Sequence, residues 1–322
     1  YGVDRKTEIV FDYSDLDIGD LIEKEDVVIN LTHCGYVKRI PVAEYRAQHR
    51  AGKGITGITT KEEDFVEKIF VTSTHDDLLF FTDKGKVYSI KGYEIPEASR
   101  QAKGRAIINL LQLSPNEKVT ALIPLKPEQK GYLMMSTKNG LIKKTALSEF
   151  DSIRKVGKIA IKLVEDDTLI GVEFTSGEDE ILVATHKGKC IHFSEKDVRA
   201  MGRDTQGVKC MDLDDDDYLV SMICLKKDEP AKENETEGTI YKILTISELG
   251  FGKRSNIDDY RLQTRAGKGI KAGVFNDKTG LLAGLKQVSN KDDAILITDQ
   301  GTIIRVTANE ISEFGRDTLG VR

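Results

Sequence analysis

The sequence predicts an all-β protein that folds as a six-bladed, propeller-like ring with about four strands per blade. In the 322-residue chain, a short apolar run followed by Thr/Ser-x-x-Gly occurs six times, and a second glycine follows each copy. We name these the turn glycines (Gly35, Gly85, Gly140, Gly188, Gly250, Gly301) and the second glycines (Gly54, Gly104, Gly157, Gly207, Gly269, Gly320). Successive turn glycines lie 48 to 62 residues apart, a period that indicates a modular architecture.

Each turn glycine is predicted to sit in a β-hairpin. In the second repeat, the apolar residues 78–81 lead into a turn with Asp83 and Gly85, and residues 86–90 then alternate polar and apolar side chains. We expect a positive φ at the turn glycine, where a Cβ would clash. Equivalent apolar runs occupy residues 28–31, 132–135, 181–184, 243–246 and 295–297.

Further strands are expected outside the hairpins. One should follow the second glycine, as at residues 105–110, and one should precede the next hairpin, as at residues 119–123 and 218–223. Six such modules favour a ring over a β-solenoid, whose rungs are usually shorter. We expect a single domain over residues 1–322. Its predicted repeats are roughly 20–70, 71–120, 121–170, 171–217, 218–285 and 286–322, with 1–12 as a closing strand and 226–238 as a charged surface loop.

The composition is that of a soluble globular protein, with 39% apolar and 31% charged residues. No apolar run is long enough to span a membrane, and the first residues do not resemble a signal peptide. Since the sequence does not begin with Met, we expect a fragment of a longer chain.

Two places in the sequence raise the question of a metal site. The four cysteines have no framework spacing and are expected to be reduced core residues of a cytosolic protein. A zinc site at His186, Cys190 and His192 is the alternative, but it matches structural zinc spacing poorly. The acidic run 212–217, broken by Leu213, could hold a divalent cation, although a solvated loop is the expected interpretation. No metal ligands are therefore predicted.

Positive charge is concentrated in one part of each repeat, although the net charge of −5 alone argues against nucleic-acid binding. The six tracts that run from turn glycine to second glycine comprise 118 residues. They hold 24 Lys and Arg against 13 Asp and Glu, while the remaining residues hold 24 against 40. In a ring these tracts would form a basic perimeter able to neutralise DNA phosphates. The alternative is that the cations only provide solubility and protect sheet edges.

The first tract contains Gln48, His49, Arg50, Ala51, Gly52, Lys53 and Gly54. This segment, named the box segment here, resembles the gyrase box, Gln-Arg-Arg-Gly-Gly-Lys-Gly, in the C-terminal domain of DNA gyrase A. Only His49 and Ala51 depart from that pattern, and the resemblance extends over all six repeats. It implies the β-pinwheel form of the ring.

The box segment also has a physical rationale. Its glycines can open N–H groups toward an anion, and its cations can bind phosphate. The alternative is a glycine-rich turn with surface cations. Walker A spacing is absent. A near-copy at residues 263–269 is either a second DNA contact or an echo of the repeat.

The resemblance implies a non-catalytic domain that binds and wraps double-stranded DNA, largely independently of sequence, for ATP-dependent negative supercoiling by a type IIA topoisomerase. It implies the rest of DNA gyrase A and the whole of DNA gyrase B as partners, and no cofactor in this domain, because ATP and Mg act elsewhere in the enzyme. It also implies a monomer when isolated, no membrane association, and a location at the nucleoid in the bacterial cytoplasm. The alternatives are the C-terminal domain of topoisomerase IV and a propeller that binds protein partners.

The predicted DNA contacts comprise the box segment and basic residues in the tracts or directly after them. Outside residues 48–54 they are Lys38, Arg39, Arg46, Lys91, Arg100, Lys103, Arg105, Lys143, Lys144, Arg154, Lys155, Lys158, Lys253, Arg254, Arg265 and Lys268. No catalytic residue is predicted.

Overall fold

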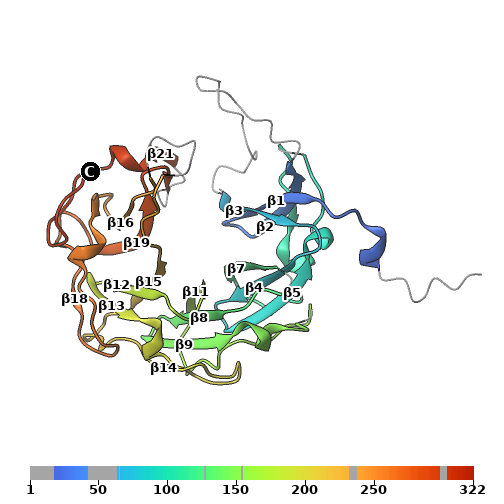
Figure 1. Ribbon diagram of the computed structural model, residues 1–322, viewed down its shortest axis with the longest axis horizontal. Helices are drawn as coiled ribbons and strands as arrows, with labels where there is room; N and C mark the ends of the chain where they lie inside the picture. Colours follow the sequence, from blue (N-terminus) through green and yellow to red (C-terminus); the bar gives the residue numbers. More distant parts are fainter. Residues whose placement is uncertain are drawn as a thin grey trace, which may run out of the picture.

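Six β-hairpins follow one another around a ring (Figure 1). The computed structural model describes residues 18–42, 64, 66–99, 101–126, 128–153, 155–231, 238–297 and 303–322. The hairpins are β1(Asp26–Thr32) with β2(Tyr36–Pro41), β4(Asp77–Thr82) with β5(Lys86–Lys91), β8(Tyr132–Thr137) with β9(Leu141–Ala146), β12(Glu180–Thr185) with β13(Lys189–Ser194), β16(Tyr241–Ser247) with β17(Gly252–Ser255), and β20(Asp293–Ile297) with β21(Ile303–Thr307). Each predicted hairpin is therefore confirmed.

A third strand lies on the inner side of each of the first five hairpins. These inner strands are β3(Val66–Ser73), β7(Val119–Leu125), β11(Leu169–Thr175), β15(Leu219–Leu225) and β19(Leu282–Ser289). Each pairs with the first strand of its hairpin, and β7, β11, β15 and β19 contact one another in succession near the centre of the ring (Figure 1). The strands predicted before the next hairpin are thus confirmed.

The fourth strand of a sheet comes from the following repeat. The short edge strands β6(Arg105–Ala106), β10(Lys158–Ile159), β14(Val208–Lys209) and β18(Ile270–Lys271) pair with β2, β5, β9 and β13, respectively. The strand predicted at residues 105–110 is therefore shorter than expected and belongs to the preceding sheet. The chain leaves the sheet at Ile107, which is 5% exposed and packs in the core between the first two blades.

The number of complete blades is smaller than predicted. The first four sheets have four strands, the fifth has three and the sixth, β20 with β21, has two. The fifth sheet gains an isolated bridge between Gly252 and Val321 where its edge strand would lie. The all-β, propeller-like ring is confirmed, but the described residues form five blades of three or four strands rather than six of four. Residues 1–12 and 232–237 of the predicted closing strand and loop lie outside the described residues.

The hydrophobic core is divided among the interfaces between consecutive sheets. In β4, Leu78 and Phe80 face the first blade, whereas Leu79 and Phe81 face the third. Phe81 meets Phe150 edge to face, with ring centroids 5.7 Å apart. Because both faces of the sheet are covered, the strand is a continuous apolar run rather than an alternating one, which explains the sequence pattern.

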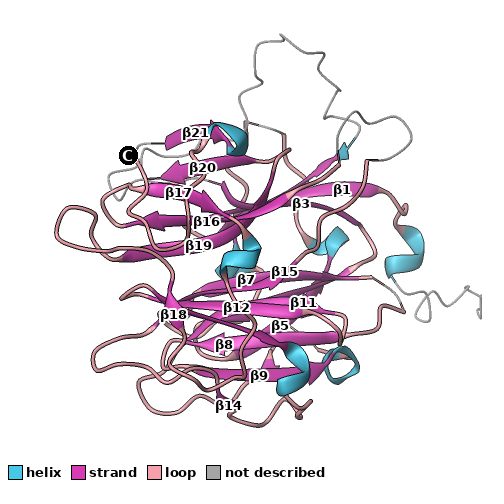
Figure 2. Cartoon of the chain, turned by 60° about the vertical axis from the view of Figure 1, so that its left-hand side comes forward, coloured by secondary structure: helices cyan, strands magenta, loops and turns pink. Residues whose placement is uncertain are grey.

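In the part of the chain that the structure describes, helical structure is limited to single 3-10 turns (Figure 2). They are η1(Ile18–Leu21), η3(Gly92–Glu94), η4(Ile107–Asn109), η5(Leu147–Phe150), η6(Glu195–Asp197), η7(Ile257–Asp259) and η8(Ala308–Glu310). Among the described residues, none of these turns approaches the length or apolarity of a membrane-crossing helix.

The second glycines allow each repeat to approach the blade before it. Gly207 has φ of +94°, and a Cβ at this position would lie 2.7 Å from the carbonyl oxygen of Ile142 in β9. Gly269 has φ of +69°, and its Cβ would lie 2.3 Å from the carbonyl oxygen of Cys190 in β13. Any larger residue would push the loop off the neighbouring strand, so the second glycine is a requirement of blade-to-blade contact.

Gly207→Ala should therefore lower the free energy of unfolding by about 2–4 kcal/mol, since it combines a left-handed backbone with a backbone clash. Gly202→Ala in the same loop is the matched control, because its Cβ would meet nothing within 4 Å and its φ is not left-handed. Urea unfolding of both variants measures the difference. Equal stability of the two variants would contradict this account.

Candidate nucleic-acid interface

Three of the predicted DNA-binding lysines are buried inside the ring. Lys38, Lys143 and Lys253 occupy the third position after the turn glycine in repeats 1, 3 and 5, and their exposed fractions are 0%, 0% and 2%. The Lys38 ammonium donates hydrogen bonds to the carbonyl oxygens of Ser99 at 3.0 Å and Ala102 at 2.9 Å. Both acceptors lie in the loop that ends at the second glycine of the following repeat.

The other two lysines repeat this arrangement. Lys143 donates to the carbonyl oxygens of Thr205 at 3.2 Å, Ala160 at 2.8 Å and Arg203. Lys253 donates to those of Thr318 at 2.7 Å, Gly315 at 3.0 Å and Arg316. Burial lowers the pKa of Lys143 and of Lys253 to about 8, so both remain mostly charged at neutral pH. We call Lys38, Lys143 and Lys253 the loop-capping lysines. They are not available to phosphate, which corrects the prediction for them.

The next position along the same strands is also committed to protein contacts. Arg39 Nε donates to the carbonyl oxygen of Ile95 at 2.8 Å, and Arg254 Nε donates to that of Ile311 at 2.7 Å. Lys144 is 7% exposed and donates to the Glu195 carbonyl oxygen at 3.0 Å. These cations bind the 3-10 segment of the following repeat, a structural role that was not predicted for them. Lys91, at the end of β5, pairs with Asp77 at 2.9 Å.

Arginines four residues before the second glycine link consecutive repeats in the opposite direction. Arg203 Nη1 donates to the carbonyl oxygen of Ile159 in β10 at 3.1 Å. Arg265 and Arg316 donate in the same way to the carbonyl oxygens of Lys209 in β14 and Lys271 in β18. Arg265, a predicted DNA contact, is therefore engaged with the protein backbone.

The box-like copy at residues 263–269 packs on the fourth blade. Ala266, with φ of +69°, donates its N–H to the carbonyl oxygen of Cys210 at 2.7 Å. The carbonyl oxygen of Gly267 accepts the N–H of Asp212 at 2.9 Å. Of the two cations in this copy, Lys268 is exposed. The segment holds its loop against the neighbouring blade and presents one lysine to solvent.

The outer edge of the ring carries a set of exposed cations at equivalent places in successive blades. Each described edge strand carries one of them: Arg105 in β6, Lys158 in β10, Lys209 in β14 and Lys271 in β18. Lys209 and Lys271 were not predicted. Both lie two residues after a second glycine, and this shared position is the signal in the sequence that could have identified them.

Three further cations lie in the loops beside these strands. Lys155 and Lys268 are exposed, and Lys155 pairs with Glu94. Lys103 is half-buried, with its Nζ 3.6 Å from the centroid of the Tyr36 ring. The remaining predicted contacts, Arg46, residues 48–54, Arg100 and Arg154, lie outside the described residues.

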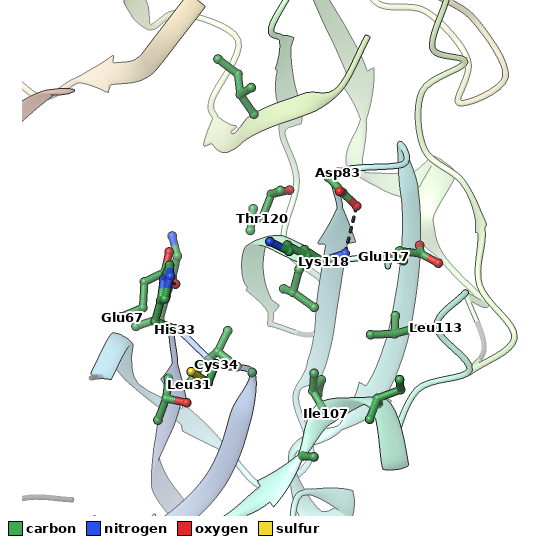
Figure 3. A pocket seen from close by; sticks show the side chains of 18 residues that line it. Leu31, His33, Cys34, Glu67, Asp83, Ile107, Leu113, Glu117, Lys118 and Thr120 are labelled. Carbon is green, nitrogen blue, oxygen red and sulfur yellow. Dashed lines mark hydrogen bonds and ion pairs between the residues drawn. The ribbon is translucent and has the colours of Figure 1, made fainter. Parts of the chain in front are cut away.

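A cavity of about 720 Å³ opens between the first two blades (Figure 3). Its acidic groups serve the fold: Glu117 accepts the Thr82 hydroxyl at 2.6 Å, and Asp83 accepts the Lys118 N–H at 2.9 Å. The cavity combines these groups with an apolar wall that includes Leu31, Ile107 and Leu113 (Figure 3).

The residues of the two possible metal sites bind separate partners. His186 pairs with Glu248 at 2.9 Å, and His192 contacts the Tyr260 carbonyl oxygen at 2.6 Å. In the acidic run, Asp214 pairs with Lys189 at 2.5 Å and Asp212 pairs with Lys209. Within the described ranges, no group of three His, Cys, Asp or Glu side chains could hold a metal ion.

The lowered pKa of Lys143 predicts that the free energy of unfolding rises with pH in the alkaline range. Its folded pKa of about 8 lies below the ordinary value near 10.4, so the unfolded chain binds more protons between these pH values and stability rises with pH. We expect this lysine to add about 2 kcal/mol to the free energy of unfolding between pH 8 and pH 10, and Lys143→Met to lose that contribution.

Chemical unfolding of the wild type and of Lys143→Met at pH 8 and at pH 10 measures this contribution. Burial raises the pKa of Cys190 and Cys210 to about 12, which opposes the rise equally in both proteins, so the difference between wild type and variant isolates Lys143. Lys196→Met, at a side chain 60% exposed, is the control. Identical pH dependence in wild type and Lys143→Met would refute the assignment.

The sequence matches the family described as DNA gyrase C-terminal domain, beta-propeller, over residues 26–73, 76–126, 131–176, 179–226, 241–289 and 292–322. It is 44% identical over 322 residues to DNA gyrase A of Escherichia coli K12, covering 100% of this chain and 35% of that protein. The corresponding gyrase protein of Clostridium acetobutylicum is 47% identical over 322 residues, again covering 100% of this chain and 37% of that protein. The chain thus spans about a third of the length of these relatives.

Two solved structures share the fold. The crystal structure of the C-terminal domain of DNA topoisomerase IV has a TM-score of 0.77 and 27% identity, covering 93% of this chain and 88% of that one. The structure of the DNA gyrase A C-terminal domain has a TM-score of 0.70 and 28% identity, covering 92% and 94%. The fold alone does not separate these two proteins, but the family match and the full-length sequence identity do. The chain belongs to the DNA gyrase C-terminal domain family.

Proposed function

We propose that this chain is a non-catalytic DNA-binding and DNA-wrapping domain of DNA gyrase A, which bends double-stranded DNA around the outer edge of its ring. One observation carries the proposal: the four edge strands each present one exposed Lys or Arg at the outermost position of their sheets. The family membership supports the same conclusion.

The arrangement suits a duplex that follows a curved path. Phosphates recur every few ångströms along DNA, and cations placed on successive blades can neutralise them and release counterions. Such contacts carry little base information, so binding would be largely independent of sequence. Bending a site of 20–30 base pairs costs about 1–6 kcal/mol, which contacts distributed along the whole arc can offset.

The proposed contacts are of two kinds. The first comprises the cations along the outer edge of the ring, called the rim here, which are the half-buried Lys103 and the exposed Arg105, Lys155, Lys158, Lys209, Lys268 and Lys271. The second comprises residues predicted from sequence alone, which are Arg46, the box segment 48–54, Arg100 and Arg154. The loop-capping lysines are excluded because their ammonium groups are buried.

The proposed setting follows from the family. The domain would act with the rest of DNA gyrase A and with DNA gyrase B, and a chiral wrap would direct ATP-dependent negative supercoiling. We propose that it needs no cofactor of its own, is a monomer when isolated, and works at the nucleoid in the bacterial cytoplasm. A DNA-binding domain of topoisomerase IV type is the second candidate, because the C-terminal domain of DNA topoisomerase IV shares this fold with a TM-score of 0.77.

A salt titration tests DNA binding. With about ten phosphate contacts, log affinity should fall with log salt at a slope near −9. Lys158→Gln should reduce the steepness by about 1, because it removes one phosphate contact. Lys286→Gln, an exposed lysine on the inner strand β19, is the matched control and should leave the slope unchanged. Negligible affinity for a duplex at low salt would instead favour a ring that binds protein partners.

Plasmid relaxation tests wrapping separately from binding. A plasmid relaxed by a nicking-closing enzyme in the presence of this chain should keep a positive shift in linking number after protein removal, since the wrap is proposed to be chiral. Gel electrophoresis of topoisomers measures the shift. An unchanged linking number in a plasmid saturated with the protein would reject the wrapping proposal. The binding proposal would stand, because a domain that binds DNA without wrapping it gives this result.

A further inference from the structure

The loop-capping lysines orient the peptide groups of the loops above them. The carbonyl oxygen of Ala102 points at Lys38, that of Thr205 at Lys143 and that of Thr318 at Lys253. In a trans peptide unit, the C=O group and the N–H group of the next residue point in opposite directions. The N–H groups of Lys103, Gln206 and Leu319 are therefore turned away from the buried ammonium groups.

These outward N–H groups have no protein acceptor in the ranges that the structure describes. Gln206 and Leu319 are exposed, and Lys103 is half-buried. The same geometry applies to Asp204 and Asp317, which follow Arg203 and Arg316. Successive main-chain N–H groups directed to one side of a loop form a concavity that suits an anion.

The charge behind the loops has the right sign for such a site. In the described residues, the hydrogen-bond acceptors of Lys143 and Lys253 are carbonyl and hydroxyl oxygens, which are neutral groups. Among the described residues, neither Lys143 nor Lys253 therefore has an ion pair that cancels its positive charge, and this charge adds to the outward field of the peptide dipoles.

We propose that residues 102–104, 203–207 and 315–320 each bind a phosphodiester oxygen of DNA through backbone N–H groups, with Lys38, Lys143 and Lys253 as positioning residues beneath them. This inference rests on the proposed DNA-binding function and adds a contact that no surface side chain supplies. Because backbone groups make the contact, it is blind to base sequence.

The three sites differ in strength. Lys103 and Arg105 add positive side chains to the first of them, whereas Asp204 and Asp317 place carboxylates in the other two. The site at residues 102–104 therefore binds phosphate most tightly. The loop of repeat 5 lacks this construction, because Ile191 occupies the lysine position and the Gly267 carbonyl oxygen accepts the Asp212 N–H instead.

Amide chemical shifts test the proposal on the unaltered protein. Titration of the isotope-labelled chain with a 20-base-pair duplex should move the amide protons of Lys103, Gln206 and Leu319 downfield, with the largest change at Lys103. The amide of Lys268, at the equivalent position in the uncapped loop, is the internal comparison. Unchanged chemical shifts of these three amide protons at a saturating duplex concentration would overturn the inference. An absence of any binding to the duplex would reject the proposed function itself.

Substitution of the first loop-capping lysine gives a second test. Lys38→Met removes the buried charge but no surface cation, so it should weaken duplex affinity about tenfold at every salt concentration without changing the salt slope. Lys103→Gln should instead make the slope less steep by about 1. Lys286→Met is the matched control, and circular dichroism verifies folding at the assay temperature. Unchanged affinity in folded Lys38→Met, or a slope change equal to that of Lys103→Gln, would contradict a positioning role.

Discussion

The attachment of each repeat to the sheet before it is the constraint on which the ring depends. A two-residue edge strand crosses to the preceding blade, and the second glycine lets its loop approach that blade within backbone contact. The attachment runs in both directions. Lysines reach forward into the next loop, and arginines such as Arg203 reach back to the preceding edge strand. The order of the blades, the geometry of the rim and the exposure of its cations all follow from these attachments between consecutive repeats.

The sequence was sufficient for the parts of the fold that local chemistry determines. Thr/Ser-x-x-Gly turns between apolar runs identified the hairpins, and the apolar segment at residues 119–123 identified the inner strand β7. The sequence was not sufficient to predict strand exchange, by which the edge strand of one repeat joins the sheet of the repeat before it. Pairing of Arg105 with Val37 joins residues of different repeats, and no local pattern specifies which sheet a two-residue strand will join.

The rim was predicted less well, for a physical reason. A lysine beside a solvated phosphate and a lysine beneath a ring of carbonyl oxygens have the same letter in a sequence, and both add to a count of charge. Lys143 is fully buried beneath the carbonyl oxygens of Ala160 and Thr205, whereas Lys158 is exposed on an edge strand. The concentration of cations in the tracts therefore has two origins, attachment between repeats and exposed loop lysines such as Lys155 and Lys268, whereas the edge-strand cations lie just beyond the tracts.

Strand exchange also bears on how the ring is completed as the chain is made. The outer edge of β2 stays open after its own repeat has been synthesised, because its partner β6 belongs to the second repeat. An open edge exposes unpaired N–H and C=O groups that can recruit a strand from another molecule. A shortened gene product that ends between two repeats would carry such an edge at its last blade. Boundaries for truncated forms are therefore best placed one edge strand beyond the last blade to be kept.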